Sequence, residues 1–500
     1  MCRKRALLLF RKEHELATNN LSILFVASEV EGLIKSGGLA DVAKALPEAL
    51  QNLQQDVRIT IPAYTSIGRL ADAEVVLETN LTSWPHTEYR VLLLTLGNNP
   101  VYLIDCEPYF NRPSMYAENN QAYTDNGERF AFFSAACLDM LPKLAFQPDI
   151  IHANDWHTGL VPFLLKHRYG NDPFFAHTKS VISIHNAVFK GVFSYDDVQC
   201  LPEFHCRNVP DAAVSATHIT MLKAGVMNAD KINAVSPTYA EELKTELGSH
   251  GMAWEFQQRA GDLVGILNGC DSSAWNPETD VYLPMNYSAD KQSMVLGKNT
   301  CKRALQQRLN LAEKNVAMFG MVCRLTQQKG VHYLLPALAD FLKHDVQVVV
   351  VGTGDPVLAA QLEEVAAQFS DKFAFVEAYD NELAHLVEAG SDFFLMPSEF
   401  EPCGLNQIYS MAYGTLPIVR GVGGLKDSVN DYDVDPCDAT GFVFYEPTSQ
   451  ALLLTMLRAL LLYAQNLTEV QRVQLHAMQK DFCWRKAAES YLQLYRSALN

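Results

Sequence analysis

Short hydrophobic runs recur along this chain, and the stretches between them repeat their apolar positions every three to four residues. Continuous apolar runs are typical of parallel strands buried on both faces, whereas the longer repeat is typical of helices that cover a sheet. The pattern therefore predicts α/β layers rather than a β-sandwich. One predicted parallel sheet comprises residues 23–27, 91–96, 150–152, 180–184 and 231–235, and a second comprises residues 317–322, 347–351, 373–376, 393–396 and 415–419.

A polar segment separates the two groups of predicted strands. Residues 265–293 are rich in Asn, Asp, Pro, Gly and Ser, which is the composition of a linker. A chain of 500 residues has room for two or three domains. We therefore predict a disordered N-terminal extension, two doubly wound α/β domains and a final amphipathic helix. Their bounds are residues 1–20, 21–265, 266–480 and 481–500.

The most informative stretch is SEFEPCGLNQIYSMAYGTLPIVRGVGGLKDSV, residues 398–429. A buried strand precedes it, Gly404 breaks the chain, and helical spacing resumes after the break. This predicts backbone N–H groups of Cys403, Gly404 and Leu405 that face a bound anion, because a helix N-terminus offers unpaired donors. Gly423 and Gly424 repeat the device after the next strand. The ordinary alternative for each turn alone is a simple strand-to-helix connection.

Two further strand ends carry cations or bare amides. Lys35, Gly37 and Gly38 follow the first predicted strand, and Arg324 and Lys329 flank a turn after residues 317–322. Glycine lets a phosphate approach the backbone, and lysine supplies a compact charge beside it. These residues predict a local basic focus for a phosphorylated ligand.

Composition excludes several other classes of function. The formal net charge of −17 opposes nucleic acid as a partner. No run of about 18 apolar residues predicts a membrane span. The 11 cysteines include no C-x-x-C pair, which favours a reducing, cytoplasmic location. The spacing of His152, His157 and His185 predicts no metal site. The run VVVVGTGDPV begins like a dinucleotide-binding motif, but Val357 replaces its third glycine.

Seven segments together resemble one family. KSGGLADV, HANDWHTGL, SIHNAVFKGVF, INAVSPTYAEEL, GILNGCDSSAWNPETD, CRLTQQKG and FEPCGLNQIY are similar, in the same order, to the signatures of bacterial glycogen synthases and plant starch synthases. The resemblance implies two Rossmann-like doubly wound domains facing a central cleft, the GT-B architecture, with the last helix crossing back to the first domain. It implies a retaining transferase that moves glucose from ADP-glucose to an α-1,4-glucan such as glycogen, without a metal or cofactor.

The resemblance also implies catalytic roles. Glu401 would lie beneath the donor glucose, with His185 and Asp155 near the sugar and Arg324 and Lys329 at the leaving phosphate. From the residues alone, the ordinary alternatives are a solvated loop carboxylate for Glu401, a core histidine for His185 and a helix N-cap for Asp155. Tyr409 stands where many retaining transferases carry a second glutamate. Without that acid, we expect a front-face route through an oxocarbenium-like transition state rather than a double displacement.

Binding residues follow from the same resemblance. Tyr379 matches an aromatic that stacks on the nucleotide base, and Asn268 matches an asparagine near the sugar, with a turn residue as its alternative. The acceptor chain would contact Tyr116, Tyr123 and Asn126. Asn406 departs from the usual threonine. Two alternatives stay open: a retaining transferase for another nucleotide sugar, and an inactive glucan-binding homologue. The sequence leaves the oligomeric state and regulation open.

Overall fold

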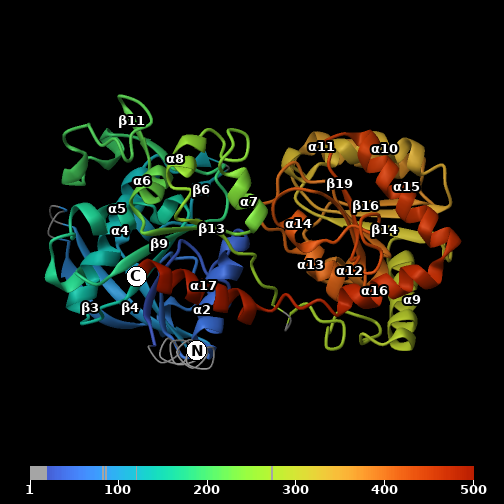
Figure 1. Cartoon of the computed structure of the whole chain (residues 1–500), viewed down its shortest axis with the longest axis horizontal. Helices are drawn as coiled ribbons and strands as arrows, with labels where there is room; N and C mark the ends of the chain where they lie inside the picture. The colour runs from blue at the N-terminus through green and yellow to red at the C-terminus, as the bar shows by residue number, and fades with distance from the viewer. Residues whose placement is uncertain (1–19, 82–83, 85–86, 120, 272–273) are drawn as a thin grey trace, which may run out of the picture. The chain divides into compact units, whose positions relative to one another are not determined.

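The computed structural model describes residues 20–500 except 82–83, 85–86, 120 and 272–273. The chain divides into two compact units (Figure 1). Unit 1 contains the described residues through Ala234, together with Leu243–Val264 and Ala487–Asn500. Unit 2 contains Val235–Glu242 and Gly265–Lys486. Apart from Asn20, the predicted disordered extension lies outside the described residues.

Unit 1 is built on a nine-stranded sheet with the order β13-β12-β9-β8-β1-β2-β5-β4-β3. The order reverses between β1 and β8, so the segments that follow these two strands meet at a topological switch point, where open α/β sheets bind ligands. The strands are β1 (Ser22–Val26), β2 (Asp56–Pro62), β3 (Glu74–Asn80), β4 (Glu88–Leu96), β5 (Asn99–Asp105), β8 (Ile150–Asn154), β9 (Lys179–Ile184), β12 (Lys231–Ala234) and β13 (Leu263–Gly265).

One predicted strand has the wrong direction. Residues 91–96 were expected to be parallel, but they belong to β4, which pairs antiparallel with β3 and with β5. The reason is the two-residue turn at Gly97 and Asn98, because so short a loop joins only antiparallel strands. Strands β2 and β5 were not predicted, although both lie in the parallel part of the sheet.

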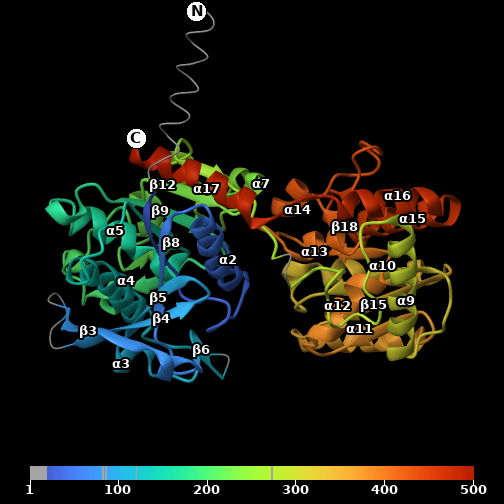
Figure 2. The ribbon, with the colours of Figure 1, turned by 90° about the horizontal axis from the view of Figure 1, so that it is seen from below.

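The helices of unit 1 cover both faces of the sheet. The last helix, α17, packs its tyrosines on strand residues: the Tyr495 hydroxyl lies 2.7 Å from His152 Nδ1, and the Tyr491 hydroxyl 2.7 Å from the Asn233 amide. Figure 2 shows α17 beside β9 and β12. The helices are α2 (Gly38–Asn52), α3 (Glu107–Phe110), α4 (Asn126–Lys143), α5 (Leu160–His167), α6 (Met221–Asn228), α8 (Ala253–Gln258) and α17 (Trp484–Leu499), whose first residues belong to unit 2.

Unit 2 is a six-stranded parallel sheet with the order β16-β15-β14-β17-β18-β19. This is the doubly wound order, with its switch point between β14 and β17. The five predicted strands are confirmed, and β19 is added at the edge. The strands are β14 (Ala317–Val322), β15 (Val346–Val351), β16 (Phe373–Val376), β17 (Phe393–Met396), β18 (Leu416–Arg420) and β19 (Phe442–Phe444).

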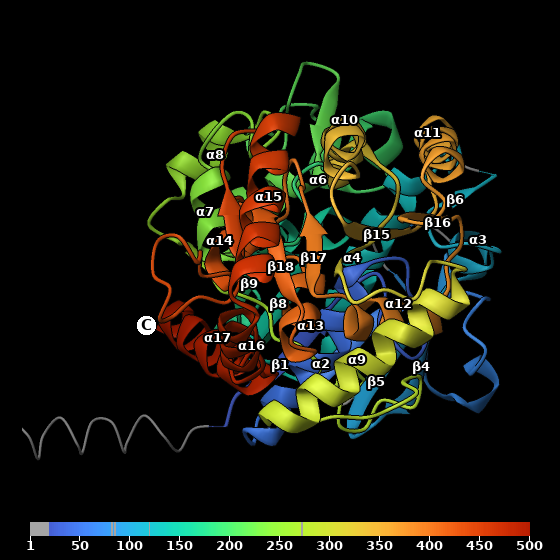
Figure 3. The same ribbon diagram turned by 90° about the vertical axis from the view of Figure 1, so that its right-hand side faces the viewer.

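Two hydrophobic clusters fill the two faces of this second sheet. Helices α10, α11, α15 and α16 bury apolar residues in one cluster, and α9 and α12 bury theirs in the other. In Figure 3, α10 lies beside α15 and α9 beside α12. The helices are α7 (Pro237–Glu242), α9 (Lys291–Arg308), α10 (Val331–Phe341), α11 (Pro356–Gln368), α12 (Asn381–Gly390), α13 (Asn406–Ala412), α14 (Gly423–Ser428), α15 (Ser449–Gln465) and α16 (Leu467–Met478).

Among the described residues, no single helix has the length and apolarity that a membrane span needs. By length and composition alone, α15 and α16 pass as a pair bent by 114°.

Candidate active site

The switch point of unit 2 places Lys329 beside Glu401. The Lys329 ammonium lies 2.6 Å from Glu401 Oε2, and the Ser398 hydroxyl donates to the same oxygen at 3.1 Å. Glu401 is only 7% exposed, so its carboxylate is a buried, paired charge rather than a solvated one. Gly330 ends the turn that carries Lys329; it has φ 71°, and a Cβ there would collide with the Pro397 carbonyl. Only glycine fits this crossing.

The amides predicted to hold an anion are open at the first glycine turn. Within the part of the chain that the structure describes, the backbone N–H groups of Cys403, Gly404 and Leu405 make no hydrogen bond. The Gln407 amide donates to the carbonyls of Cys403 and Gly404, at 3.1 Å each, which fixes the turn. The Asn406 side chain points away, since it donates to the Val322 carbonyl at 2.9 Å.

The second glycine turn is different. Gly423 N–H donates to Glu242 Oε1 at 2.9 Å, and Gly424 N–H donates to the Glu401 carbonyl at 3.1 Å. Both amides predicted to face a phosphate are therefore engaged with protein acceptors.

The remaining predicted residues of unit 2 differ in exposure. Tyr379 follows β16 and is 93% exposed, so a ring face is accessible to a ligand. Arg324 is also exposed and makes no hydrogen bond or ion pair with any residue that the structure describes. Asn268 is 6% exposed, and its Oδ1 finds no hydrogen-bond partner among the described residues. A buried acceptor without a donor is costly, and therefore marks a place where a ligand could donate.

The incomplete dinucleotide motif has a structural explanation. A Cβ at Gly352 would collide with the Cys323 carbonyl, and one at Gly354 with the Leu325 carbonyl. Both glycines therefore serve the packing of the loop after β15 against the loop after β14.

In unit 1, Asp155 follows β8 at the switch point, and His185 follows the neighbouring strand β9. Asp155 Oδ1 accepts from the His185 N–H at 2.7 Å and from the Asn186 N–H at 3.4 Å, and it makes no side-chain hydrogen bond to the turn that follows. Asp155 therefore stands at the N-cap position of that turn but does not cap it through its side chain. Burial raises the pKa of Asp155 to about 7, although the two backbone donors oppose the shift.

His185 is held in a neutral state. Its Nε2 lies 2.9 Å from Asn154 Oδ1, and Asn154 is itself fixed by its amide donating to the Val26 carbonyl at 3.0 Å. Burial lowers the pKa of His185 to about 4. A neutral imidazole and a carboxyl that titrates near neutrality stand side by side, which is a combination typical of functional sites.

The loop after β1 carries the predicted cation. Lys35 forms ion pairs with Asp41 at 2.7 Å and Glu31 at 3.0 Å, and its side chain is partly exposed. A Cβ at Gly37 or Gly38 would meet no atom within 4 Å, so the fold of unit 1 does not itself require glycine at either position. Open space beside both residues is consistent with the approach of a ligand.

The predicted acceptor residues are mostly tied to their neighbours. The Tyr116 hydroxyl donates to Ser28 Oγ at 2.7 Å. The Asn126 amide donates to the Tyr116 carbonyl at 2.9 Å and its Oδ1 accepts from Arg129 at 2.6 Å, so both ends of this side chain are used. The Tyr123 hydroxyl, by contrast, is buried without a partner among the described residues.

Two residues that shape these turns are not marked by any sequence motif. Glu29 is buried and accepts from the backbone N–H groups of Ser36 and Gly37, which orders the loop after β1. Arg420 donates to the Ser398 and Glu399 carbonyls, which orders the loop before Glu401. No motif signals either role, because each depends on contacts between segments distant in sequence.

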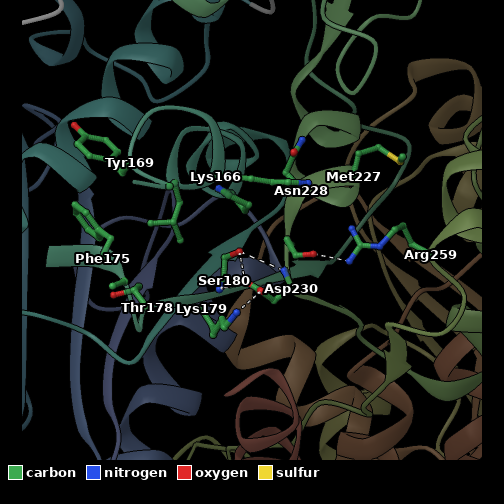
Figure 4. Close-up of a pocket in the computed structure, with 15 residues that line it drawn as sticks. Lys166, Tyr169, Phe175, Thr178, Lys179, Ser180, Met227, Asn228, Asp230 and Arg259 are labelled. Atoms are coloured by element: carbon green, nitrogen blue, oxygen red, sulfur yellow. Dashed lines mark hydrogen bonds and ion pairs between the residues drawn. The ribbon is translucent and has the colours of Figure 1, made fainter. Parts of the chain in front are cut away.

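Unit 1 also has a cavity of about 580 Å³ away from these residues (Figure 4). It lies where β9 and β12 begin, the edge opposite the switch-point loops. Its Lys179 pairs with Asp230 at 3.3 Å, and its Arg259 donates to the carbonyls of Val226 and Ala229. These charges are occupied in holding strands and loops together.

Comparisons with known proteins agree on one family. Residues 22–258 match the starch synthase catalytic domain, and residues 302–470 match the glycosyl transferases group 1. Glycogen synthase from Vibrio parahaemolyticus is 98% identical over 97% of this chain and 100% of its own length. Glycogen synthase from Vibrio vulnificus is 82% identical over 97% of this chain and all of its own length.

A solved structure supports the same assignment. The catalytic domain of Starch Synthase IV from Arabidopsis thaliana, bound to ADP and acarbose, has a TM-score of 0.86 and 31% identity, covering 96% of this chain and 100% of that one. Sucrose-phosphate synthase from Thermosynechococcus elongatus, at 18% identity and a TM-score of 0.58 over 96% and 99%, shares the fold. With its two parallel-sheet α/β units of the GT-B class, this chain belongs to the glycogen synthase and starch synthase family of glucosyltransferases.

Proposed function

We propose that the protein transfers glucose from ADP-glucose to the non-reducing 4-hydroxyl of an α-1,4-glucan, with retention at the anomeric carbon. The observation that carries this proposal is the buried Glu401–Lys329 pair beside three amides that make no hydrogen bond within the described chain. One turn thus offers a carboxylate for a sugar and donors for a phosphate. The identity to glycogen synthases supports the substrate class.

The diphosphate, the adenine and the glucose of the donor would each contact different residues of unit 2. The open amides of Cys403, Gly404 and Leu405 would donate hydrogen bonds to the diphosphate, whose charge Arg324 and Lys329 would also neutralise. Adenine would stack on the exposed ring of Tyr379. The glucose ring would lie against Glu401, and Asn268 Oδ1, a buried acceptor that finds no donor among the described residues, would accept a hydrogen bond from a sugar hydroxyl.

The chemistry would depend on charge at the leaving phosphate. As the glycosidic bond stretches, negative charge grows on the phosphate, and fixed cations and amides stabilise it more strongly than they stabilise the ground state. Glu401 would stabilise the positive ring. Tyr409 stacks on Trp275, with ring centroids 4.3 Å apart, so the position of the second acid holds a packed aromatic side chain. This favours the front-face route over a double displacement.

In unit 1, His185 and Asp155 would bind sugar hydroxyls rather than exchange protons as a pair. The neutral imidazole, with a pKa near 4, has one nitrogen engaged by Asn154. Asp155 also orders the loop that carries His185 through its two backbone contacts. Lys35, which is ion-paired with Asp41 and Glu31, would supply a cation to a phosphate, and Gly37 and Gly38 would supply open backbone.

The function is tested by supplying purified protein with glycogen and either ADP-glucose or UDP-glucose, and following nucleotide release and polymer growth. We expect kcat/KM to be higher for ADP-glucose, because a purine offers the larger stacking face. Preference for UDP-glucose would favour the transferase for another nucleotide sugar. Glycogen binding without release of either nucleotide would favour the inactive homologue.

A further inference from the structure

The second glycine turn is packed directly against the backbone of the proposed catalytic loop. Gly424 N–H donates to the Glu401 carbonyl at 3.1 Å and to the Pro402 carbonyl at 3.2 Å. Gly423 has φ 41°, and a Cβ there would collide with the Glu401 carbonyl. A Cβ at Gly424 would collide with the Cys403 carbonyl. The two glycines are therefore required because two backbones meet without side chains between them.

Residues Val235–Glu242 form hydrogen bonds with both the Glu401 loop and the Gly423–Gly424 turn. Glu242, at the end of α7, accepts from the Gly423 N–H at 2.9 Å, and the Ser236 hydroxyl donates to the Pro402 carbonyl at 2.6 Å. Thr238 donates to Asp427 through its backbone N–H at 2.7 Å and its hydroxyl at 2.6 Å. Residues Val235–Glu242 thus contact the loop of Glu401 and both ends of α14.

We propose that Glu242 is a positioning residue for Glu401, and that the Gly423–Gly424 turn transmits this positioning instead of binding phosphate. The inference rests on the proposed function and deepens it. Its physical basis is a series of hydrogen bonds. The Glu242 carboxylate accepts from the Gly423 N–H, and the Gly424 N–H donates to the Glu401 carbonyl. The Ser236 hydroxyl donates to the Pro402 carbonyl. Displacing the carboxylate loosens the peptide that carries the Glu401 side chain.

Contacts on both sides hold the loop of Glu401. Burial raises the pKa of Glu242, while the Gly423 N–H and the charges of Arg420 and Lys426 oppose that shift. Arg420 in turn donates to the Ser398 and Glu399 carbonyls on the other side of the loop. The loop of Glu401 is therefore held on one side by Arg420 and on the other by the glycine turn.

The segment Val235–Glu242 is covalently continuous with unit 1 on both sides. Ala234 before the segment and Leu243 after it belong to unit 1, although Val235–Glu242 belongs to unit 2 by its contacts. The segment leaves directly from the end of β12, a strand of the unit 1 sheet. The segment that holds the Glu401 loop is therefore joined covalently to unit 1 at both of its ends.

The test is a double-mutant cycle on kcat, with ADP-glucose and glycogen as substrates. Glu242→Ala should lower kcat by about 10- to 100-fold, as expected for misplacing a reacting group by about 1 Å, while KM for ADP-glucose stays within about twofold. Glu242→Gln keeps an acceptor for the Gly423 N–H and should recover most of that loss. In a Glu401→Gln background, Glu242→Ala should lower kcat by less than about threefold, because the effects of residues that act through one another are not additive. Glu241→Ala, at the exposed neighbour, is the matched control and should leave kcat unchanged.

Several results would overturn the inference. An equal loss of kcat in both backgrounds would mean that Glu242 does not act through Glu401. A rise in KM for ADP-glucose, or in the inhibition constant of ADP, with kcat unchanged would mean that the glycine turn binds phosphate after all. If Glu242→Ala does not fold, Ser236→Ala enters the same cycle with the same expectation. Wild-type protein inactive with ADP-glucose would instead defeat the proposed function, which keeps the two failures apart.

Discussion

At the residue scale, Lys329 pairs with the buried Glu401 carboxylate, and we propose that it also stabilises the leaving phosphate. Lys329→Ala should lower kcat by about two to three orders of magnitude, as is typical of losing one charge-stabilising group at a transition state.

Arg324→Ala should lower kcat by a similar factor without a cost in stability, because Arg324 is exposed and unpaired among the described residues. Lys329→Arg should not restore full activity, since a planar fork cannot replace a compact ammonium. Steady-state kinetics beside thermal melts separate the effects, and unchanged kcat in both alanine variants would place the leaving group elsewhere.

Tyr379 provides a test of nucleotide recognition. Its side chain is almost fully exposed, so Tyr379→Ala removes no packing from the folded protein. We expect KM for ADP-glucose to rise by about tenfold and kcat to change little, because base stacking contributes about 1–3 kcal/mol and is equally strong in the ground and transition states. A fall in kcat at constant KM would show that stacking is not the role of this ring.

Asp155 makes the stability of unit 1 depend on pH. Its folded-state pKa of about 7 lies above the unfolded value of about 3.9, so the carboxyl favours folding when it is protonated. This contribution is fully present below about pH 4 and is lost as the pH rises through about 7. Asp155→Asn removes the titration, so the variant should gain stability relative to the wild type by up to about 4 kcal/mol between pH 4 and 8. Urea unfolding at several pH values measures this, and a constant difference between the two proteins would contradict it.

At the scale of elements, the pattern of hydrophobic runs predicted the parallel strands well and the edge of the first sheet poorly. Runs such as residues 317–322 are apolar throughout because helices cover both faces, and that pattern is unambiguous. Residues 91–96 are also apolar, but the direction of β4 is set by the short turn at Gly97, and an apolar run carries no information about that turn. In strand β2, of sequence DVRITIP, Arg58 interrupts the run of apolar residues, and its guanidinium lies over the Phe146 ring.

In the candidate site, too, features with local causes were predictable from the sequence, and features set by contacts between distant segments were not. The amides of Cys403, Gly404 and Leu405 are open as expected, because a glycine break between a strand and a helix has local causes. The roles of Asp155 and of the Gly423 and Gly424 amides depend on contacts between distant segments, which spacing cannot reveal. The catalytic and binding roles assigned to these residues remain predictions for the kinetic experiments to test.

The docking of α17 gives a prediction about stability. His152 is fully buried between the Tyr495 hydroxyl and Ser183 Oγ, each 2.7 Å away. Tyr495→Phe leaves one imidazole nitrogen without a partner and should lower the free energy of unfolding by about 1–3 kcal/mol. Tyr445→Phe is a control at an exposed tyrosine, with an expected change below about 0.5 kcal/mol. Urea unfolding followed by tryptophan fluorescence measures both, and equal stabilities of the two variants would show that the hydroxyl does not anchor α17.

At the scale of the whole molecule, a strongly acidic protein must bind an anionic donor. The net charge of −17 repels ADP-glucose at long range, so capture depends on local groups such as Arg324 and the open amides of the Glu401 loop. Added salt should therefore change KM for ADP-glucose by less than about threefold at up to 0.2 M, because the long-range repulsion and the local attraction are screened together. A rise of KM by more than tenfold would show that long-range attraction governs donor capture.

The proposed reaction lengthens an α-1,4-glucan from ADP-glucose with retention of configuration. The most direct measurement is a proton NMR time course of the wild-type protein with ADP-glucose and a short α-1,4-linked maltooligosaccharide, with released ADP measured in the same samples. We predict that one new α-1,4-linked anomeric signal appears for each ADP released, from the first time point and without added metal. A β-linked product, or release of ADP with free glucose in place of polymer growth, would contradict the account.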